Sequence, residues 1–362
     1  MAKSLIIPFF IPHAGCPFTC VYCNQWEISG ESAVARPEEI RAKVGEYRNT
    51  RNDPATPIET AFYGGSFTGL TAEIQEDWLR SAYTLKKEGL ISGIRLSTRP
   101  DYISKEVLQR LARYGVTTIE LGVQSLDDEV LAKSCRGHSV DDTLQATRLI
   151  REYPFSLVYQ LMLGLPGETA LSARISAKKT VAAKPDGVRI YPTVVLKNTA
   201  LAKWYEQGSY RPWTLQQAVE MGTEWLAVFS YYKIPVIRMG LQASANLTRS
   251  GDLLAGPYHP AYGELVKSSL MLKQIQQLLF QIRPELSGEL LNISISFHPG
   301  DYSKVAGQKK RNIIRLKNTY RLRDIELRPD AEMKRDDIAI TAAPKTYCLP
   351  RKEFLELYRI KD

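Results

Sequence analysis

The chain has 362 residues, of which 44% are hydrophobic, and its formal net charge is +9, so it has enough apolar sequence for a large buried core. No apolar run reaches the about 18 residues of a transmembrane helix. The N-terminal stretch MAKSLIIPFFIPHAG is interrupted by two prolines and lacks a signal peptide's apolar segment. Five cysteines, an odd number, indicate a reducing compartment, so we expect a cytoplasmic protein with no membrane contact.

The first predicted element is a strand over residues 4–11, and a loop with three cysteines follows it. Cys16, Cys20 and Cys23 in HAGCPFTCVYCNQ have the spacing CxxxCxxC, which favours metal ligands over a disulfide. Two kinds of centre fit this spacing. One is a zinc ion with His13 as fourth ligand, and the other is an iron–sulfur cube whose fourth iron has no protein ligand. The spacing alone leaves both open.

Strand and helix patterns alternate from this loop to about residue 240. The predicted helices cover residues 37–48, 72–89 and 104–115, and the predicted strands cover 4–11, 59–65, 93–100, 117–125, 156–166, 187–195 and 234–240. This alternation predicts an α/β fold with a parallel sheet curved into a full or partial (β/α) barrel. In such barrels the functional residues lie at the carboxyl ends of the strands, where the glycine and glutamine motifs of this chain fall.

Taken together, these motifs resemble the radical S-adenosylmethionine (SAM) superfamily. The similarity rests on the cysteine triad, on Tyr22 just before the last cysteine, and on the glycine pair after the second strand. FYGGSFTGL, STRPD, ELGVQS, CRGHS, LMLGLPGET and VRIYPT are most similar to the radical domain of the catalytic subunit of Elongator, in a short form without an acetyltransferase domain. Oxygen-independent coproporphyrinogen oxidases share a weaker version. The resemblance implies an enzyme, either a transferase or an oxidoreductase, and favours iron and sulfur over zinc.

The resemblance also implies roles for individual residues. Cys16, Cys20 and Cys23 would hold a [4Fe–4S] cluster that reductively cleaves SAM to a 5′-deoxyadenosyl radical, with an electron donor such as flavodoxin or ferredoxin. The residues expected at SAM are Gly64 and Gly65 at the amino group, Arg136 at the carboxylate, Gln124 and Gln160 at the ribose, and Tyr22 and Gly164 at the adenine. Gln160 fits equally well as a core amide with a protein partner.

Some features depart from the Elongator pattern. Residues 243–362 do not have the pattern of an acetyl-coenzyme A fold, and residues 1–15 do not have the pattern of the basic N-terminal domain expected in that family. Arg189 replaces the lysine expected before the Ile-Tyr-Pro run. The group that is added to the substrate is therefore left open.

Three segments are expected, namely a barrel over 1–242, a loop and connecting helix over 243–290, and a basic α+β domain over 291–362. The last segment is similar to a KH domain in its order of strand, helix, glycine turn, helix and strand, although the second glycine of the GxxG loop is missing. Residues 301–324 hold eight Lys or Arg and two Asp. We expect RNA contacts at Lys309, Lys310, Arg311 and Arg315, although a solvated basic face has the same composition.

Two functions remain at this stage. The first is a radical SAM enzyme that modifies tRNA or another RNA. The alternative is a radical SAM enzyme for a small metabolite or a porphyrin-like carboxylate, with no nucleic-acid substrate. Because phosphate contacts release counterions, a steep loss of RNA affinity with salt would favour the first function.

Overall fold

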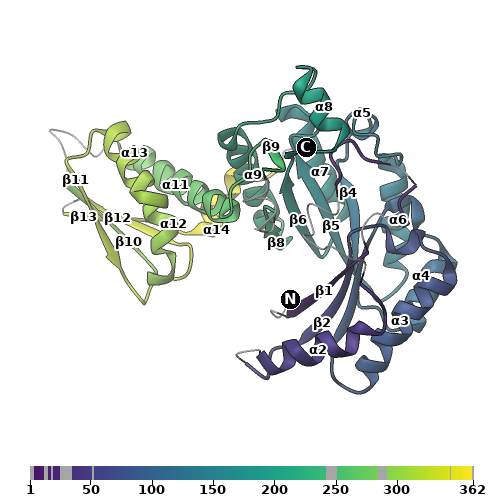
Figure 1. Ribbon diagram of the computed structural model, residues 1–362. Coiled ribbons are helices and arrows are strands. Elements are labelled where there is room, and N and C mark those ends of the chain that lie inside the picture. The colour runs from purple at the N-terminus through teal and green to yellow at the C-terminus, as the bar shows by residue number, and fades with distance from the viewer. Residues whose placement is uncertain are drawn as a thin grey trace. The chain divides into compact units, whose positions relative to one another are not determined.

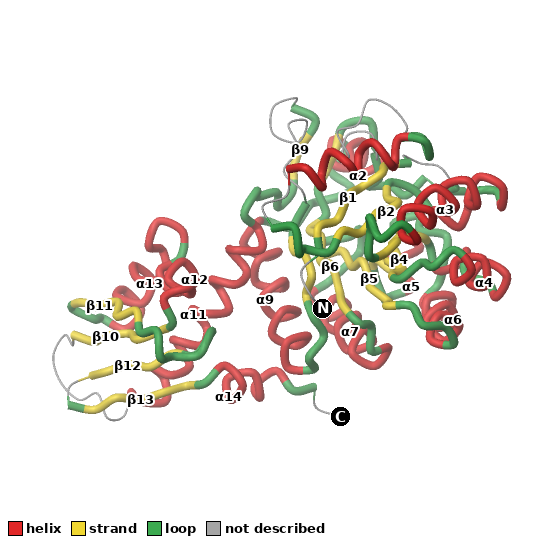
Figure 2. The backbone as a smooth tube through the Cα atoms, turned by 90° about the horizontal axis from the view of Figure 1, so that it is seen from below, coloured by secondary structure: helices red, strands yellow, loops and turns green. Residues whose placement is uncertain are grey.

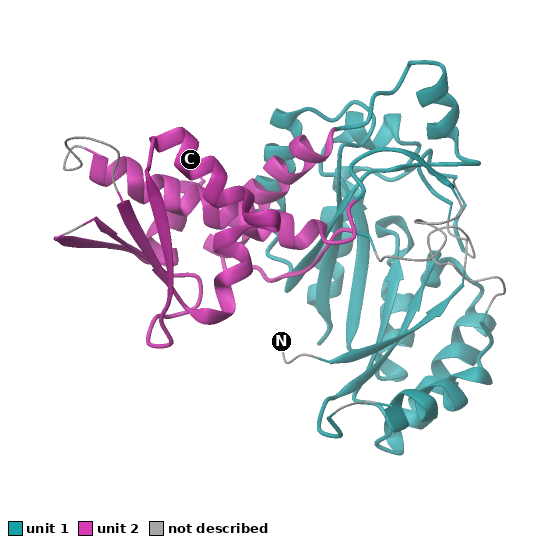
Figure 3. Ribbon diagram, turned by 60° about the vertical axis from the view of Figure 1, so that its left-hand side comes forward, with its two compact units in different colours: residues 1–213, 241–258 teal, residues 214–240, 259–362 magenta. Residues whose placement is uncertain are grey.

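A computed structural model describes residues 4–11, 15–17, 19–24, 35–50, 53–241, 251–283, 292–342 and 344–360. The chain divides into two compact units, residues 1–213 with 241–258 and residues 214–240 with 259–362 (Figure 3). The predicted domain boundaries at 242 and 290 fall outside the described residues and stay predictions. No helix in the described ranges is both long enough and apolar enough to span a membrane.

The main sheet is parallel and curved (Figure 1). Neighbouring strands from β1 to β6 pair in parallel. The strand order is β1-β2-β3-β4-β5-β6-β8, with edges at β1 and β8, so the barrel is partial. All seven predicted strands are confirmed, as β1 Leu5–Phe10, β2 Ile58–Tyr63, β3 Gly93–Thr98, β4 Thr118–Gln124, β5 Ser156–Leu163, β6 Gly187–Pro192 and β8 Val236–Met239.

Helices connect these strands, and Figure 2 shows them in red around the yellow strands. Most begin directly after a Ser, Thr or Asp whose side chain accepts a hydrogen bond from the first turn, such as Thr71, Ser104 and Ser139. The helices are α2 Glu39–Thr50, α3 Ala72–Lys87, α4 Lys105–Arg113, α5 Asp128–Lys133, α6 Val140–Arg151, α7 Ala170–Ala183 and α8 Ala200–Glu206. A short antiparallel pair, β7 Val195–Leu196 and β9 Leu253–Ala255, completes the first unit.

Charged and polar side chains from five neighbouring strands meet inside the barrel. Glu120 is completely buried and accepts hydrogen bonds from Tyr63 Oη at 2.7 Å and Gln160 Nε2 at 2.9 Å. It also pairs with Arg95 and Arg189, each at 2.9 Å. Burial raises the pKa of Glu120, but Arg189, the Tyr63 hydrogen bond and Arg95 together hold it below its ordinary value. We call these five residues the interior ionic layer.

One contact within the interior ionic layer shows how strongly the sheet curves. Arg189 on β6 donates through Nη2 to Tyr63 Oη on β2 at 3.2 Å. Three strands lie between β2 and β6, so a flat sheet would hold them about 19 Å apart at about 4.8 Å per strand. The contact therefore requires the sheet to curl until its second and sixth strands face each other.

The second unit has a four-stranded sheet in the order β11-β10-β12-β13. β10 pairs in parallel with β11 and antiparallel with β12. The predicted order of strand, helix, glycine turn, helix and strand is confirmed by β10, α12, α13 and β11. The elements are α9 Leu215–Tyr231, α11 Tyr262–Ile282, β10 Asn292–Phe297, α12 Tyr302–Ala306, α13 Arg311–Tyr320, β11 Asp324–Pro329, β12 Ile338–Ala342, β13 Lys345–Leu349 and α14 Arg351–Leu355.

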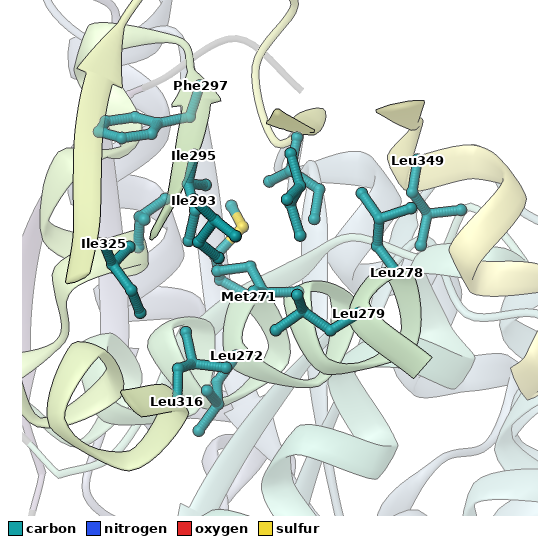
Figure 4. Close-up of a cluster of buried hydrophobic side chains, with 14 of the residues drawn as sticks. Met271, Leu272, Leu278, Leu279, Ile293, Ile295, Phe297, Leu316, Ile325 and Leu349 are labelled. Carbon is teal, nitrogen blue, oxygen red and sulfur yellow. The ribbon is translucent and has the colours of Figure 1, made fainter. Parts of the chain in front are cut away.

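One face of α11 packs on this smaller sheet. Met271, Leu272 and Leu279 of the helix meet Ile293, Ile295 and other buried side chains of the strands (Figure 4). The connecting helix predicted within residues 243–290 is therefore confirmed as α11, and it belongs to the core of the second unit. Burial of this apolar face gives the unit a core of its own.

The first prediction concerns the interior ionic layer. Glu120→Gln removes the negative charge that pairs with Arg95 and Arg189. Since breaking a buried ion pair leaves an uncompensated buried charge, we expect the free energy of unfolding to fall by about 3–5 kcal/mol. Urea denaturation measures this loss.

Glu88→Gln is the matched control, because Glu88 pairs with Arg41 on the surface, where their side chains are 42% and 57% exposed. This change should leave the urea midpoint nearly unchanged. Equal losses for the two variants would contradict the role given to Glu120.

Candidate functional site

The cysteine loop lies at the carboxyl end of β1, and backbone hydrogen bonds fix it to three other segments. Ile11 N donates to Tyr63 O at 2.7 Å, Val21 N to Ser134 O at 3.2 Å, and Leu201 N to Val21 O at 2.8 Å. These contacts tie the loop to the ends of β2 and α5 and to the start of α8. The loop therefore has a defined place at the rim of the barrel.

Two glycines allow this loop to approach the turn after β2. Gly15 has φ +70°, and a Cβ atom there would overlap the Ser66 carbonyl oxygen. A Cβ atom on Gly69 would likewise overlap the Gly15 carbonyl. Neither position can hold a larger residue without moving the backbone. The backbone N–H of Ser66 also hydrogen-bonds to Cys16, which lowers the pKa of its thiol, although burial raises that pKa by more.

The three thiols differ in burial. Cys20 is buried, whereas Cys16 and Cys23 are half-buried. Among the described residues, no three His, Cys, Asp or Glu side chains converge on one point as ligands of a single ion. His13, the fourth ligand of the zinc alternative, lies outside the described residues.

Arg136 brings positive charge to these cysteines. Its Nη1 lies 3.3 Å from Cys20 Sγ, and its Nη2 donates to Gly122 O at 2.6 Å. The side chain is buried, and within the described part of the chain its Nε has no hydrogen-bond partner and no carboxylate pairs with it. A nearby cation stabilises thiolates, and a buried guanidinium without a carboxylate can take an anionic ligand. The residues present therefore fit a thiolate-held cluster beside a carboxylate.

The predicted glycine pair follows β2 directly. Gly64 has φ +100°, a backbone conformation that residues with a side chain rarely adopt. This turn leads into Ser66, the residue that contacts the cysteine loop. Gly64 and Gly65 thus directly precede the residue that contacts Cys16, and their own contact with SAM stays a prediction.

The two predicted ribose partners have different surroundings. Gln124 ends β4 beside Arg136, since a Cβ atom on Gly122 would lie 2.8 Å from Arg136 Nη2 and 3.1 Å from Gln124 Nε2. Gln160 instead donates to Glu120 and belongs to the interior ionic layer. The core-amide interpretation of Gln160 therefore has an observed contact, and its ribose contact stays a prediction.

The residues expected at the adenine lie near each other at the rim. Tyr22 packs against a cluster that contains Leu201 and Tyr210. Tyr210 Oη donates to Gly164 O at 2.6 Å, and a Cβ atom on Gly164 would lie 3.2 Å from the Trp213 ring. Tyr210 thus links the segments of Tyr22 and Gly164, and an adenine contact with either residue stays a prediction.

Two further residues of this region, to which the sequence alone assigns no site role, are buried. Glu168 accepts a hydrogen bond from Gly164 N at 2.5 Å, and burial raises the pKa of Glu168 to about 8. His138 is 4% exposed and bonds to Val123 O at 3.3 Å. Both lie inside motifs used for the resemblance, GLPGET and CRGHS. The sequence alone cannot assign a role to Glu168 or His138, because their hydrogen-bond partners are brought to them only by the fold.

The predicted RNA-binding residues lie in the second unit, at the turn between α12 and α13. Lys309, Lys310, Arg311 and Arg315 are exposed, and none forms an ion pair within the described residues. Lys309 and Lys310 have φ +53° and +58°, so this turn is left-handed at two successive lysines.

Two other cations of the same stretch are already paired, whereas Arg321 and Arg323 are exposed and form no ion pair within the described residues. Lys304 pairs with Asp301 at 2.9 Å, and Lys317 pairs with Asp324 at 2.7 Å. The four cations of the turn thus differ from Lys304 and Lys317, whose charges are neutralised by ion pairs within the unit.

The site can now be compared with known proteins. The model of the radical SAM superfamily matches residues 10–173, and that of the radical SAM C-terminal domain matches residues 185–271. The chain belongs to the radical SAM superfamily. It is therefore a radical SAM enzyme, and its cofactors are a [4Fe–4S] cluster and SAM.

Named relatives confirm the predicted resemblance to Elongator. The tRNA uridine(34) acetyltransferase of Dehalococcoides mccartyi is 31% identical over 233 residues, which cover 55% of this chain and 50% of the relative. Mouse Elongator complex protein 3 is 28% identical over 261 residues, 60% of this chain and 48% of the relative. The chain thus spans about half the length of these relatives.

A solved structure shares the fold. It is that of archaeal Methanocaldococcus infernus Elp3 with an N-terminal deletion, with a TM-score of 0.59 at 22% sequence identity. The match covers 75% of this chain and 64% of the other. At this identity the likeness supports the fold alone.

The second prediction tests Arg136. Arg136→Ala removes the charge-assisted hydrogen bonds expected at the methionine carboxylate, so SAM binding to the reconstituted protein should weaken by about 2–3 kcal/mol. Equilibrium dialysis with labelled SAM measures this change, and the iron content should stay at the parent level. Arg113→Ala, on the exposed side of α4, is the control and should bind SAM normally. Unchanged affinity in Arg136→Ala would place the carboxylate elsewhere.

Proposed function

We propose that this protein cleaves SAM at a cluster held by Cys16, Cys20 and Cys23 and uses the radical to modify tRNA or another RNA. The observation that carries the proposal is Arg136, a buried cation between the Cys20 sulfur and the Gly122 carbonyl, which no carboxylate neutralises within the described residues. The odd cysteine count supports a cytoplasmic location.

The proposed chemistry divides between the cluster and the protein. Once reduced by a donor such as flavodoxin or ferredoxin, the cluster supplies the electron that breaks the sulfonium bond of SAM. The chain's residues bind and orient SAM. Gly64 and Gly65 offer backbone to its amino group, Arg136 binds its carboxylate, and Gln124 binds its ribose.

The interior ionic layer would close the deep side of this site. Glu120 and Gln124 of β4 lie opposite Val158 and Leu161 of β5, three residues apart, which corresponds to about 10 Å along a strand. The layer therefore lies inside the rim, and its two arginines are neutralised by Glu120 and by Glu59, which also pairs with Arg95. We infer that it shields the reacting atoms from water below without competing for SAM's charged groups.

The RNA part of the proposal rests on the second unit and on the relatives. The four unpaired cations of the α12–α13 turn suit phosphate contacts, because each Lys or Arg that meets a phosphate releases counterions. Relatives named as tRNA uridine(34) acetyltransferases support tRNA as the substrate class. The proposed enzyme class is a transferase, and the group it transfers is left open.

The third prediction tests the radical chemistry. Anaerobically reconstituted protein should bind about four irons and four sulfides and, after reduction, convert SAM to 5′-deoxyadenosine and methionine. Cys20→Ala should lose both properties, because one thiolate ligand is missing. Iron analysis and chromatography of the products measure them. A stoichiometric zinc site without SAM turnover would refute the proposed function.

The fourth prediction tests the basic turn. Changing Lys309, Lys310 and Arg311 together to alanine should weaken tRNA binding and reduce the slope of log affinity against log salt by up to about three. Filter binding at several salt concentrations measures the slope. SAM cleavage without RNA should survive.

The matched control removes the same charge from the first unit through Arg113→Ala, Lys178→Ala and Lys203→Ala, all at exposed positions. This control should bind tRNA like the parent. If the turn variant also binds tRNA like the parent at every salt concentration, the substrate is better sought among small molecules. Nucleoside mass spectrometry after incubation with SAM and tRNA would identify a modified base.

A further inference from the structure

The end of β4 departs from regular strand geometry beside the proposed SAM site. Its register with β5 shifts between Leu121 and Gln124, and Gln124 has φ +64°. Ser125 N donates to Val123 O at 2.8 Å, which closes a tight turn. A left-handed backbone is disfavoured for a residue with a side chain, so surrounding contacts must hold this bulge.

His138 supplies one of these contacts. Its Nε2 lies 3.3 Å from Val123 O, and because a carbonyl only accepts, Nε2 carries the proton. The pKa of His138 is lowered to about 3 by burial and by the charges of Arg136 and Arg99, so the ring is neutral near pH 7. Val123 O therefore has two donors, Ser125 N from within the bulge and His138 Nε2 from the CRGHS turn.

Arg136 and His138 bind consecutive carbonyls of the same bulge. Arg136 Nη2 donates to Gly122 O at 2.6 Å, and His138 binds the next carbonyl along the chain. The turn that carries them is left-handed on both sides of Arg136, with φ +50° at Cys135 and +77° at Gly137. This conformation turns two side chains that are two residues apart toward one strand end.

The bulge in turn determines where Arg136 can lie. A Cβ atom on Gly122 would meet Arg136 Nη2 at 2.8 Å and Gln124 Nε2 at 3.1 Å, so a larger residue there would displace the ends of these side chains. Gly122 and Gln124 lie on either side of the carbonyl that His138 holds. A shift of that carbonyl would move both neighbours of the guanidinium.

We propose that His138 is a positioning residue of the SAM site, whose Nε2–H holds the Val123 carbonyl and so fixes the bulge that orients Gln124 and Arg136. The inference rests on the proposed binding of SAM by Arg136. It gives His138 no contact with SAM and no proton transfer.

Three single variants of the reconstituted full chain test this role. His138→Leu removes the donor, His138→Asn keeps an amide that is too short to reach the carbonyl, and His138→Gln places an amide N–H near the original Nε2. Loss of one hydrogen bond predicts SAM binding about five- to tenfold weaker for the leucine and asparagine variants. The glutamine variant should stay within about twofold of the parent. Equilibrium dialysis gives the affinities, and iron content and urea midpoints are measured in parallel.

A double-mutant cycle separates positioning from general stability. In an Arg136→Ala background, His138→Leu should weaken SAM binding clearly less than it does in the parent, because Arg136, one of the two side chains that it positions, is gone. Additive losses would overturn the proposal, as would equal SAM affinities of the asparagine and glutamine variants. If the leucine variant assembles no cluster, the difference in SAM affinity between the His138→Asn and His138→Gln variants tests the proposal instead. A parent protein that binds no SAM refutes the proposed function itself, whereas a parent that binds SAM with unaffected His138 variants refutes only this inference.

Discussion

The buried carboxylate of Glu120 and the two arginines that pair with it constrain the whole first unit. Moving a carboxylate out of water costs several kcal/mol, and only close cations and hydrogen-bond donors offset that cost. Its partners come from β2, β3, β5 and β6, so the sheet must curl until all of them reach one point. Arg189 suits this position, because its planar fork pairs with both oxygens of Glu120 and still reaches Tyr63.

The curl also assembles the rim. Parallel strands end on the same side, so the same curvature that brings β2 and β6 together gathers the loops after β1, β2 and β4. The contacts there are mostly between backbones, as between Gly15 and Gly69, and they require small residues where chains touch. Arg136 then introduces a charge that the described part of the chain leaves without a carboxylate. The charges of the interior ionic layer are thus paired, whereas the charge of Arg136 at the rim has no carboxylate partner there. This arrangement suits a ligand that carries its own carboxylate.

The second unit also contains both paired and unpaired basic residues. Asp301, which is fully buried, draws Lys304 and Arg335 into ion pairs that brace the start of α12. The cations of the following turn have no such partner within the described residues, and they are exposed to solvent. Basic residues of one short stretch therefore divide into those that stabilise the unit and those that stay exposed and unpaired within the described residues, as the proposed RNA contact requires.

The sequence by itself determined the strands, the longer helices, the cysteine triad and the family, because periodicity and motif spacing are local properties of the chain. Tertiary structure alone decided which polar residues meet. Gln160 and Gln124 have the same side chain and lie on neighbouring strands. In the curved sheet, however, Gln160 donates a hydrogen bond to Glu120, whereas Gln124 lies beside Arg136. The role proposed for His138 depends on one carbonyl 15 residues away in the chain. Such pairings are set by distances across the fold, which the order of residues does not contain.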